Sequence, residues 1–264
     1  MPLAKGWSAE RLLVSDPEQH TAECVQKEVG PDGFAVSGNL IVLPNEVRGD
    51  ITIYRDGRPI LHKSTGDAYV YDVALHGGLL YVLEGVYVNA DQVTKLQVYS
   101  VINGGRKLTR LRTHELTLGD NSSDMELHFV GDNLIASSSE GGSVLAEGPG
   151  PFPDGATYDL QTKTASIQPA DGTPAVLFHG HDILGLDLLA TDDAFVWYRV
   201  EDMVGGDYVY RVPRSGSARI RAYRPADRHG AGTRDLVVDG GLVHALSMTS
   251  HMAAAQVLLL GPVP

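Results

Sequence analysis

The chain has 264 residues, of which 43% are hydrophobic, so it can bury a large core within a single domain. Its formal net charge of −12 argues against a nucleic-acid partner, because phosphate groups attract basic surfaces. No apolar run approaches the roughly 18 residues of a membrane-spanning helix, so we expect no membrane partner.

The first residues carry no signal for export. The stretch MPLAKGWSAERLL lacks the apolar core of a signal peptide. Cys24 is the only cysteine, which excludes a disulfide framework within the chain and fits a reducing compartment. Both features predict a cytoplasmic location. The excess of Arg over Lys, with abundant Ala and Gly, is typical of GC-rich bacterial genomes.

From residue 32 onward the chain repeats one pattern: an Asp, a short apolar run, a tight polar turn and a second apolar run. The five copies begin at Asp32, Tyr71, Asp124, His181 and Arg234. In four of them a third and a fourth strand are expected around second turns at 56–57, 103–104, 161–163 and 214–216. A repeat of about 40 to 60 residues is the period of four-stranded propeller blades.

The second copy, residues 68–117, shows the pattern most clearly. Asp72 to His76 alternates between polar and apolar residues, and Gly77-Gly78 then turns the chain. Further along, LQVYSVI and KLTRLRTHEL flank Asn103-Gly104. Asn-Gly between two alternating runs is a strong signal for a β-hairpin, so this copy predicts a four-stranded meander.

On these repeats the chain resembles the β-propeller superfamily, of the WD40-like and PQQ-like kind, over nearly its whole length. It lacks the Trp-Asp dipeptide of WD40 blades and the Gly-aromatic signature of PQQ-binding blades, so the resemblance implies an architecture and no functional residues. We expect an all-β, five-bladed β-propeller of four-stranded antiparallel blades in a single domain. The blades are expected at about 32–66, 67–118, 119–170, 171–226 and 227–264. A sandwich of irregular hairpins is the alternative.

The last copy ends after its third strand, so its outer strand must come from another part of the chain. Residues 1–31 offer two β-prone segments, at 11–15 and 21–29. A strand from one chain end that completes the last blade would remove an exposed sheet edge. We therefore expect the N-terminal region to close the ring.

Loop lengths are expected to differ between the two faces of the ring. Loops between first and second strands, and between third and fourth, are short; the others are long, at 84–93, 137–155, 169–181, 225–234 and 248–254. Binding and catalytic residues concentrate in long loops on rigid scaffolds, so the long-loop face is the expected functional face. The Gly- and Pro-rich stretch 137–155 is either a lid or a surface excursion.

A repeated Asp is expected where the innermost strand of each blade begins, at Asp32, Asp72, Asp124, Asp182 and Asp235. Carboxylates crowded around a narrow channel repel one another, so some would be protonated, paired with Arg234, or bound to a divalent cation such as Ca²⁺ or Mg²⁺. In the alternative interpretation, each Asp accepts hydrogen bonds from backbone amides and links neighbouring blades.

The stretch around His181 is the most distinctive in the chain. His181 and Asp182 are predicted as a catalytic pair, with Asp124 and Glu126 as complementary carboxylates. His179 lies on the same side of an extended strand as His181, and the two could hold a transition metal together with His229 or His251. Substrate contacts are predicted for Tyr71, Asp72, His179 and Arg234, whereas His76 and His128 near the short turns are interpreted as structural.

These residues predict an enzyme that converts a small molecule by cyclisation, isomerisation, elimination or hydrolysis, in a metabolic or biosynthetic role. No phosphate-binding glycine motif occurs, so we expect no nucleotide cofactor. The alternatives are a non-catalytic binding or scaffold module and a five-bladed glycosidase. For the glycosidase, 7% aromatic residues and two Trp leave few platforms for sugar rings. The sequence indicates no oligomeric state.

Overall fold

The computed structural model describes seventeen ranges of the chain. These are 7–14, 33–45, 49–66, 68–88, 91–118, 125–130, 132–138, 142–149, 154–159, 161–169, 175–179, 183–191, 194–202, 206–213, 221–223, 233–248 and 255–262. All regular elements in them are β-strands, which confirms the predicted all-β class. The same ranges contain no helix that is long and apolar enough to cross a membrane.

The first two sheets are four-stranded antiparallel meanders. The first contains, in order, β2 (Ala35–Ser37), β3 (Leu40–Asn45), β4 (Asp50–Arg55) and β5 (Arg58–Ser64). The second contains β6 (Tyr69–His76), β7 (Leu79–Val88), β8 (Asp91–Ile102) and β9 (Lys107–Leu116). The turns fall at the residues that favour positive φ: Gly77 and Gly78 have φ of 57° and 76°, and Asn103 has 52°. The meander predicted for 68–117 is therefore present.

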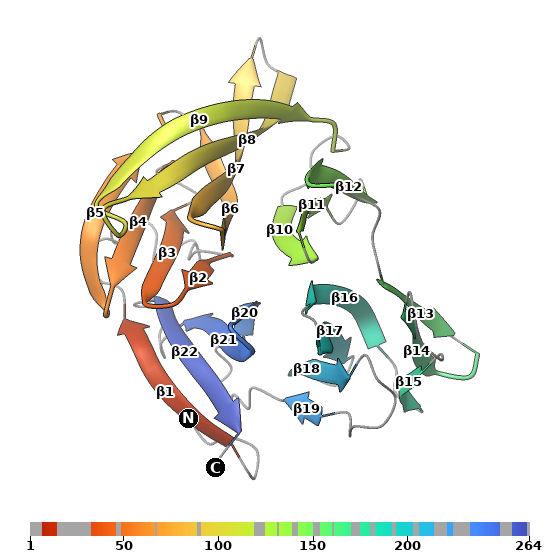
Figure 1. The fold of residues 1–264 in the computed structure, drawn as a ribbon. Coiled ribbons are helices and arrows are strands. Elements are labelled where there is room, and N and C mark those ends of the chain that lie inside the picture. The colour runs from red at the N-terminus through yellow and green to blue at the C-terminus, as the bar shows by residue number, and fades with distance from the viewer. Residues whose placement is uncertain are drawn as a thin grey trace.

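The third copy of the repeat divides into two sheets. One contains β10 (Met125–Val130), β11 (Asn133–Ser138) and β12 (Gly142–Glu147); the other contains β13 (Asp154–Asp159), β14 (Thr164–Pro169) and β15 (Ala175–His179). The turn at 161–163 was predicted to join two strands of the third blade, but it joins β13 to β14 in the separate sheet. Figure 1 shows this sheet beside the ring of the others.

The last two sheets are again four-stranded. The order β16 (Ile183–Thr191), β17 (Phe195–Asp202), β18 (Gly206–Pro213) and β19 (Arg221–Tyr223) is sequential. The final sheet contains β20 (Thr233–Asp239), β21 (Leu242–Met248) and β22 (Ala255–Pro262), and β1 (Trp7–Val14) pairs antiparallel with β22. The red β1 runs beside the blue β22 in Figure 1, so the two ends of the described chain share one sheet.

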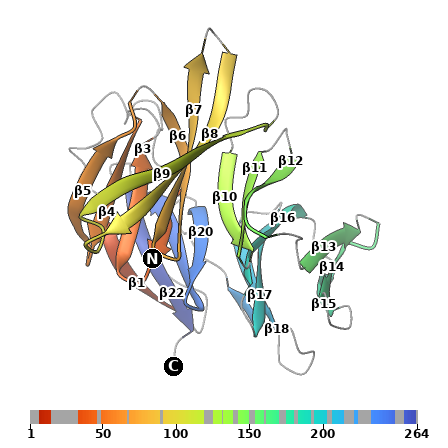
Figure 2. The same cartoon turned by 45° about the horizontal axis from the view of Figure 1, so that its top comes forward.

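The innermost strands of five sheets face one central space. Figure 1 shows β2, β6, β10, β16 and β20 around it, while outer strands such as β5 and β9 lie at the rim. In the turned view of Figure 2, β6, β10 and β20 lie near the middle of the molecule. Residues from all five inner strands line a single cavity there. The first strand of each repeat is therefore the element that positions any site in the channel.

The core lies between neighbouring sheets and not within one of them. Phe34 and Ile41 of the first sheet pack with Leu246 of the last, and Leu83 and Leu134 join the second sheet to the third. The middle strands β3 and β4 are buried along nearly their whole length and carry near-continuous apolar runs, whereas the outer strands β5 and β9 are largely exposed.

Three stretches predicted as long loops contain strands. Residues 84–93 are mostly the ends of β7 and β8, which pair with each other as far as Val88 and Asp91. The supposed lid at 137–155 contains β12, which pairs with β11, and 169–181 contains β15. Their Gly, Pro and polar residues suggested loops, but ladder hydrogen bonds with a neighbouring strand outweigh such weak local preferences.

Candidate functional site

One position recurs along the inner strands, four residues before the residue that closes the first hairpin. It is held by Gly33, just before β2, and by Asp72, Glu126, Asp187 and Asp235, so four of the five are acidic. The predicted strand-start residues Asp32, Asp124 and Asp182 lie outside the described residues. The hairpin turn sets the register, and Asp72 and Asp235 lie within their strands, not at the start.

Asp72 joins three sheets at the channel. Its side chain is buried, with the residue 3% exposed, and Oδ1 accepts a hydrogen bond from the Val73 amide at 2.7 Å. Oδ2 accepts from the amide of Leu127 in the next inner strand, at 2.6 Å. On the other side, a Cβ atom at Gly33 would lie 1.9 Å from Oδ1, so only glycine leaves room for this carboxyl group.

Asp235 makes the same kind of contacts between the last sheet and the first. Its Oδ1 accepts from the Leu236 amide at 2.6 Å, and its Oδ2 accepts from the Phe34 amide at 3.3 Å. Near the short turns, Asp239 Oδ2 accepts from Gly38 N at 2.8 Å. These bonds are of the kind expected when repeated Asp residues link neighbouring blades, and Asp235 in this way connects the last sheet to the first.

The pKa values of the buried Asp72 and the partly buried Asp235 are both raised. Burial, followed by the charge of Asp235, raises the pKa of Asp72 well above its usual value. Burial and the charge of Glu126 raise the pKa of Asp235 to about 7, although Arg199 and backbone amides favour its charged form. Asp235 therefore changes its protonation state close to neutral pH.

Glu126 and Arg199 supply the exposed carboxylate and the cation of the channel. Arg199 Nη1 lies 3.7 Å from Glu126 Oε1, and the side chains are 14% and 52% exposed respectively. The sequence pointed to Glu126 but not to Arg199, which lies on β17 opposite Asp187 and carries no motif. Arg234 was expected to balance the acidic cluster; its backbone lies in β20, and its side chain is outside the described residues.

The carboxyl groups line a cavity of about 120 Å³ at the centre of the ring. Asp72, Glu126 and Asp235 contribute from three different inner strands, and His76 and His128 also line the cavity. Apolar residues complete the wall: Phe34, Leu127, Phe129, Leu189, Leu236 and Val237. The cavity thus combines groups that can exchange protons with an apolar surface, as small-molecule sites commonly do.

The two histidines of the cavity have different surroundings. The His76 ring stacks on Phe129 with centroids 4.5 Å apart, and its Nε2 lies 3.9 Å from Asp132 Oδ1. His128 is largely buried, and this burial lowers its pKa to about 4. His128 is consequently a neutral imidazole at physiological pH. Their place near the short turns predicts structural roles, and no pattern in the sequence indicates that these two histidines line the cavity.

Several predicted site residues are not at this cavity. Tyr71 points away from Asp72 and packs against the core between the second and third sheets, and Gly85 leaves room for its ring. His179 lies in β15, in the sheet beside the ring. The residues Asp32, Asp124, His181, Asp182, His229 and His251 lie outside the described residues.

A metal site is not formed by the side chains that the structure describes. Among them, no three His, Cys, Asp or Glu groups come close enough together to hold an ion. The oxygens of Asp72 and Asp235 accept backbone amide hydrogens, which compete with metal coordination. A divalent-cation site that uses Asp32, Asp124 or Asp182 stays a prediction.

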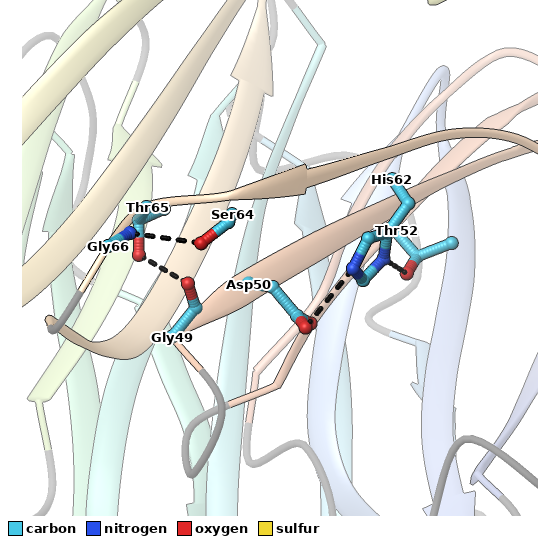
Figure 3. A network of polar contacts seen from close by, with 7 residues as sticks. All are labelled: Gly49, Asp50, Thr52, His62, Ser64, Thr65 and Gly66. Atoms are coloured by element: carbon cyan, nitrogen blue, oxygen red, sulfur yellow. Dashed lines mark hydrogen bonds and ion pairs between the residues drawn. The ribbon is translucent and has the colours of Figure 1, made fainter.

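A second polar cluster links β4 to β5 in the first sheet (Figure 3). His62 lies 3.2 Å from Asp50 Oδ2 through Nε2, and 3.2 Å from Thr52 Oγ1 through Nδ1. This hydroxyl–imidazole–carboxylate order is that of a nucleophilic relay, but Thr52 is only 6% exposed, so a substrate cannot reach its hydroxyl. The cluster therefore holds the outer edge strand in register.

Comparison with known proteins supports the fold and goes no further. No family model matches the chain, and neither does any curated protein. The PQQ-bound aldose sugar dehydrogenase of Streptomyces coelicolor is similar in structure, with 13% identity, a TM-score of 0.50, and coverage of 98% of this chain and 99% of that chain. A putative exported protein of Bacteroides fragilis has 8% identity, a TM-score of 0.48, and coverage of 97% and 95%.

The β-propeller domain of Cps50 (Swd1) from Myceliophteria thermophila is more distant, with 10% identity, a TM-score of 0.39, and coverage of 86% of this chain and 82% of that chain. Identities this low speak only for the fold. The similarity to the aldose sugar dehydrogenase, together with the ring of antiparallel sheets, confirms the predicted architecture: the chain has a β-propeller fold, without assignment to a specific family.

Proposed function

We propose that the protein is an enzyme that converts a small organic molecule in its central channel by acid–base chemistry. The observation that carries this proposal is the gathering of Asp72, Glu126 and Asp235, from three inner strands, at one partly apolar cavity. Structural roles alone do not require an exposed carboxylate such as Glu126 beside two buried carboxyl groups. Perturbed carboxyl groups in a concave site are typical of catalytic centres.

Glu126 and Asp235 suit complementary parts of a proton transfer. Glu126 is half-exposed and lies beside the Arg199 guanidinium, so its carboxyl group is placed to remove a proton from a bound molecule. Asp235, whose pKa is about 7, can return a proton at neutral pH. The Arg199 guanidinium can stabilise negative charge that develops between the two. Isomerisation, elimination and cyclisation all need this pair of steps.

We propose a five-bladed ring, with β1 as the outer strand of the last blade and the sheet β13–β15 as an addition beside the ring. Five inner strands contribute to the cavity, and β1 pairs with β22; these observations support the count. His181, Asp182 and Asp124 precede inner strands in the sequence, so we propose that they extend the site at the mouth of the channel, where they could add a divalent cation.

The proposed function is tested by a thermal-shift screen of a metabolite library on the wild-type protein and on Glu126→Gln in parallel. We expect some compounds to stabilise the wild type but not the variant, because the variant loses the carboxylate while keeping its shape. Mass spectrometry of those compounds after incubation should then show a product. Compounds that bind equally to both proteins, or that are recovered unchanged, would instead favour a non-catalytic binding module.

A further inference from the structure

His128 is one of the residues that line the central cavity, and no role in the fold accounts for its position. It lies in β10, two residues after Glu126, so the two side chains share one face of the strand. The alternate residue Met125 is buried in the core between the second and third sheets. Glu126 and His128 lie on the opposite face of the strand, and both are among the residues that line the cavity, as is the neighbouring Leu127.

The imidazole of His128 makes no hydrogen bond or ion pair with any part of the chain that the structure describes, and burial alone accounts for its lowered pKa. His62, by contrast, lies 3.2 Å from Asp50 through its Nε2. A neutral imidazole has one N–H donor and one nitrogen acceptor, and in His128 both are open to a ligand in the cavity.

The rest of the cavity offers little to an ionic ligand. Both oxygens of Asp72 and of Asp235 already accept backbone amides, and Glu126 is balanced by Arg199. The remaining titratable groups of the lining are His76, held against Phe129, and Asp239, bonded to Gly38. What remains for a ligand is a neutral donor and acceptor within an apolar wall.

We propose that His128 is the substrate-binding residue of the channel and that it holds a hydroxyl group of a small uncharged molecule. A hydroxyl both donates and accepts, so it matches the neutral imidazole from either side. The cavity of about 120 Å³ limits the bound part to a few carbon and oxygen atoms. Glu126, on the same face of β10, then stands beside the carbon skeleton that carries the hydroxyl. This inference rests on the proposed function of the same cavity.

The imidazole nitrogens of His128 can be observed directly by long-range ¹H–¹⁵N correlation spectra of the wild-type protein. Three probes of similar size separate the classes of ligand: 1,2-propanediol, propylammonium and propionate. We expect saturable shifts of the His128 nitrogens with the diol only. Shifts with propylammonium or propionate but not the diol would overturn the assignment of an uncharged ligand, and no response to any probe would overturn the binding role of His128.

Two variants give a second measurement. His128→Gln should weaken diol binding by about tenfold or more, because a buried hydrogen bond of the ligand is lost. His62→Gln, far from the channel on β5, is the matched control and should bind like the wild type. If His128→Gln does not fold, His128→Asn takes its place. Equal affinity in wild type and folded variant would overturn the proposal.

The outcomes also separate this inference from the proposed function. Diol binding at His128 without conversion of any library compound would leave the inference standing and refute the enzyme. Conversion of a compound that is unaffected by His128→Gln would refute the inference and leave the enzyme standing.

Discussion

At the scale of single residues, Asp72 and Asp235 each serve the fold and the channel at once. Their oxygens accept amides from neighbouring inner strands, and the same groups line the cavity. The sequence identified both residues, and Glu126, from their places in the repeat. It could not identify Arg199 beside Glu126, or His128 at the cavity, because packing between strands far apart in the chain, and not a local pattern, sets their surroundings.

The raised pKa of Asp235 makes folding stability depend on pH. Its pKa rises from 3.8 to about 7, so the folded protein binds this proton more tightly than the unfolded chain does. Between these values folding takes up a proton, and the free energy of unfolding falls as the pH rises. Below 3.8 the group is protonated in both states and contributes no pH dependence.

Asp235→Asn should therefore flatten the pH dependence of the free energy of unfolding between pH 3.8 and about 7, because an amide does not titrate. The substitution also removes the negative charge that raises the pKa of Asp72. Urea unfolding at several pH values from acid to neutral measures this effect. Glu115→Gln, an exposed carboxylate outside the channel, should leave the curve unchanged. Parallel curves for wild type and Asp235→Asn would contradict the assigned pKa.

At the scale of elements, hairpins could be predicted but their sheet membership could not. The strands β6 to β9 follow from alternation and from turns at Gly77-Gly78 and Asn103-Gly104, which are local signals. The hairpin of β13 and β14 was also indicated by its turn, yet it joins β15 instead of β12. Local sequence favours a hairpin, but side-chain packing between segments far apart in the chain decides which sheet it enters.

An ion pair between Arg112 and Glu147 connects the short third sheet to the second. Arg112 of β9 donates from Nη2 to Glu147 Oε1 and from Nε to Glu147 Oε2, the latter at 3.2 Å, and Glu147 lies at the end of β12. The third sheet contains three described strands and packs on the second through an apolar cluster. The ion pair adds a polar contact to this packing. Bidentate geometry makes such a pair stronger than an ordinary surface ion pair.

Glu147→Gln should lower the free energy of unfolding by about 1 kcal/mol, a modest value because both side chains are partly exposed to water. A double-mutant cycle with Arg112→Gln, followed by urea denaturation, isolates the coupling from other effects of each change. We expect a coupling that weakens in high salt. Strictly additive changes would mean that the pair does not connect the two sheets energetically.

At the scale of the whole molecule, strands from the N-terminal and C-terminal regions share one sheet. The last sheet contains β22 from the C-terminal region and β1 from the N-terminal region, and Asp235 and Leu246 join this sheet to the first. The sequence predicted an N-terminal strand in this place from the missing outer strand of the last repeat. Segment 11–15 overlaps β1, and segment 21–29 lies outside the described residues.

Removal of residues 1–14 should abolish the cooperative unfolding transition, whereas removal of a peripheral tail would leave it unchanged. The deletion exposes the ladder groups of β22 at a sheet edge and takes away the pairing from Trp7–Pro262 to Val14–Gln256. Ala9→Pro tests the same contact with one residue, since Ala9 pairs with Leu260 in the middle of β1 and proline cannot donate to the ladder. Calorimetry should show a lowered melting temperature for the point variant and no single sharp transition for the deletion. If both melt at the temperature of the full-length protein, β1 does not close the ring.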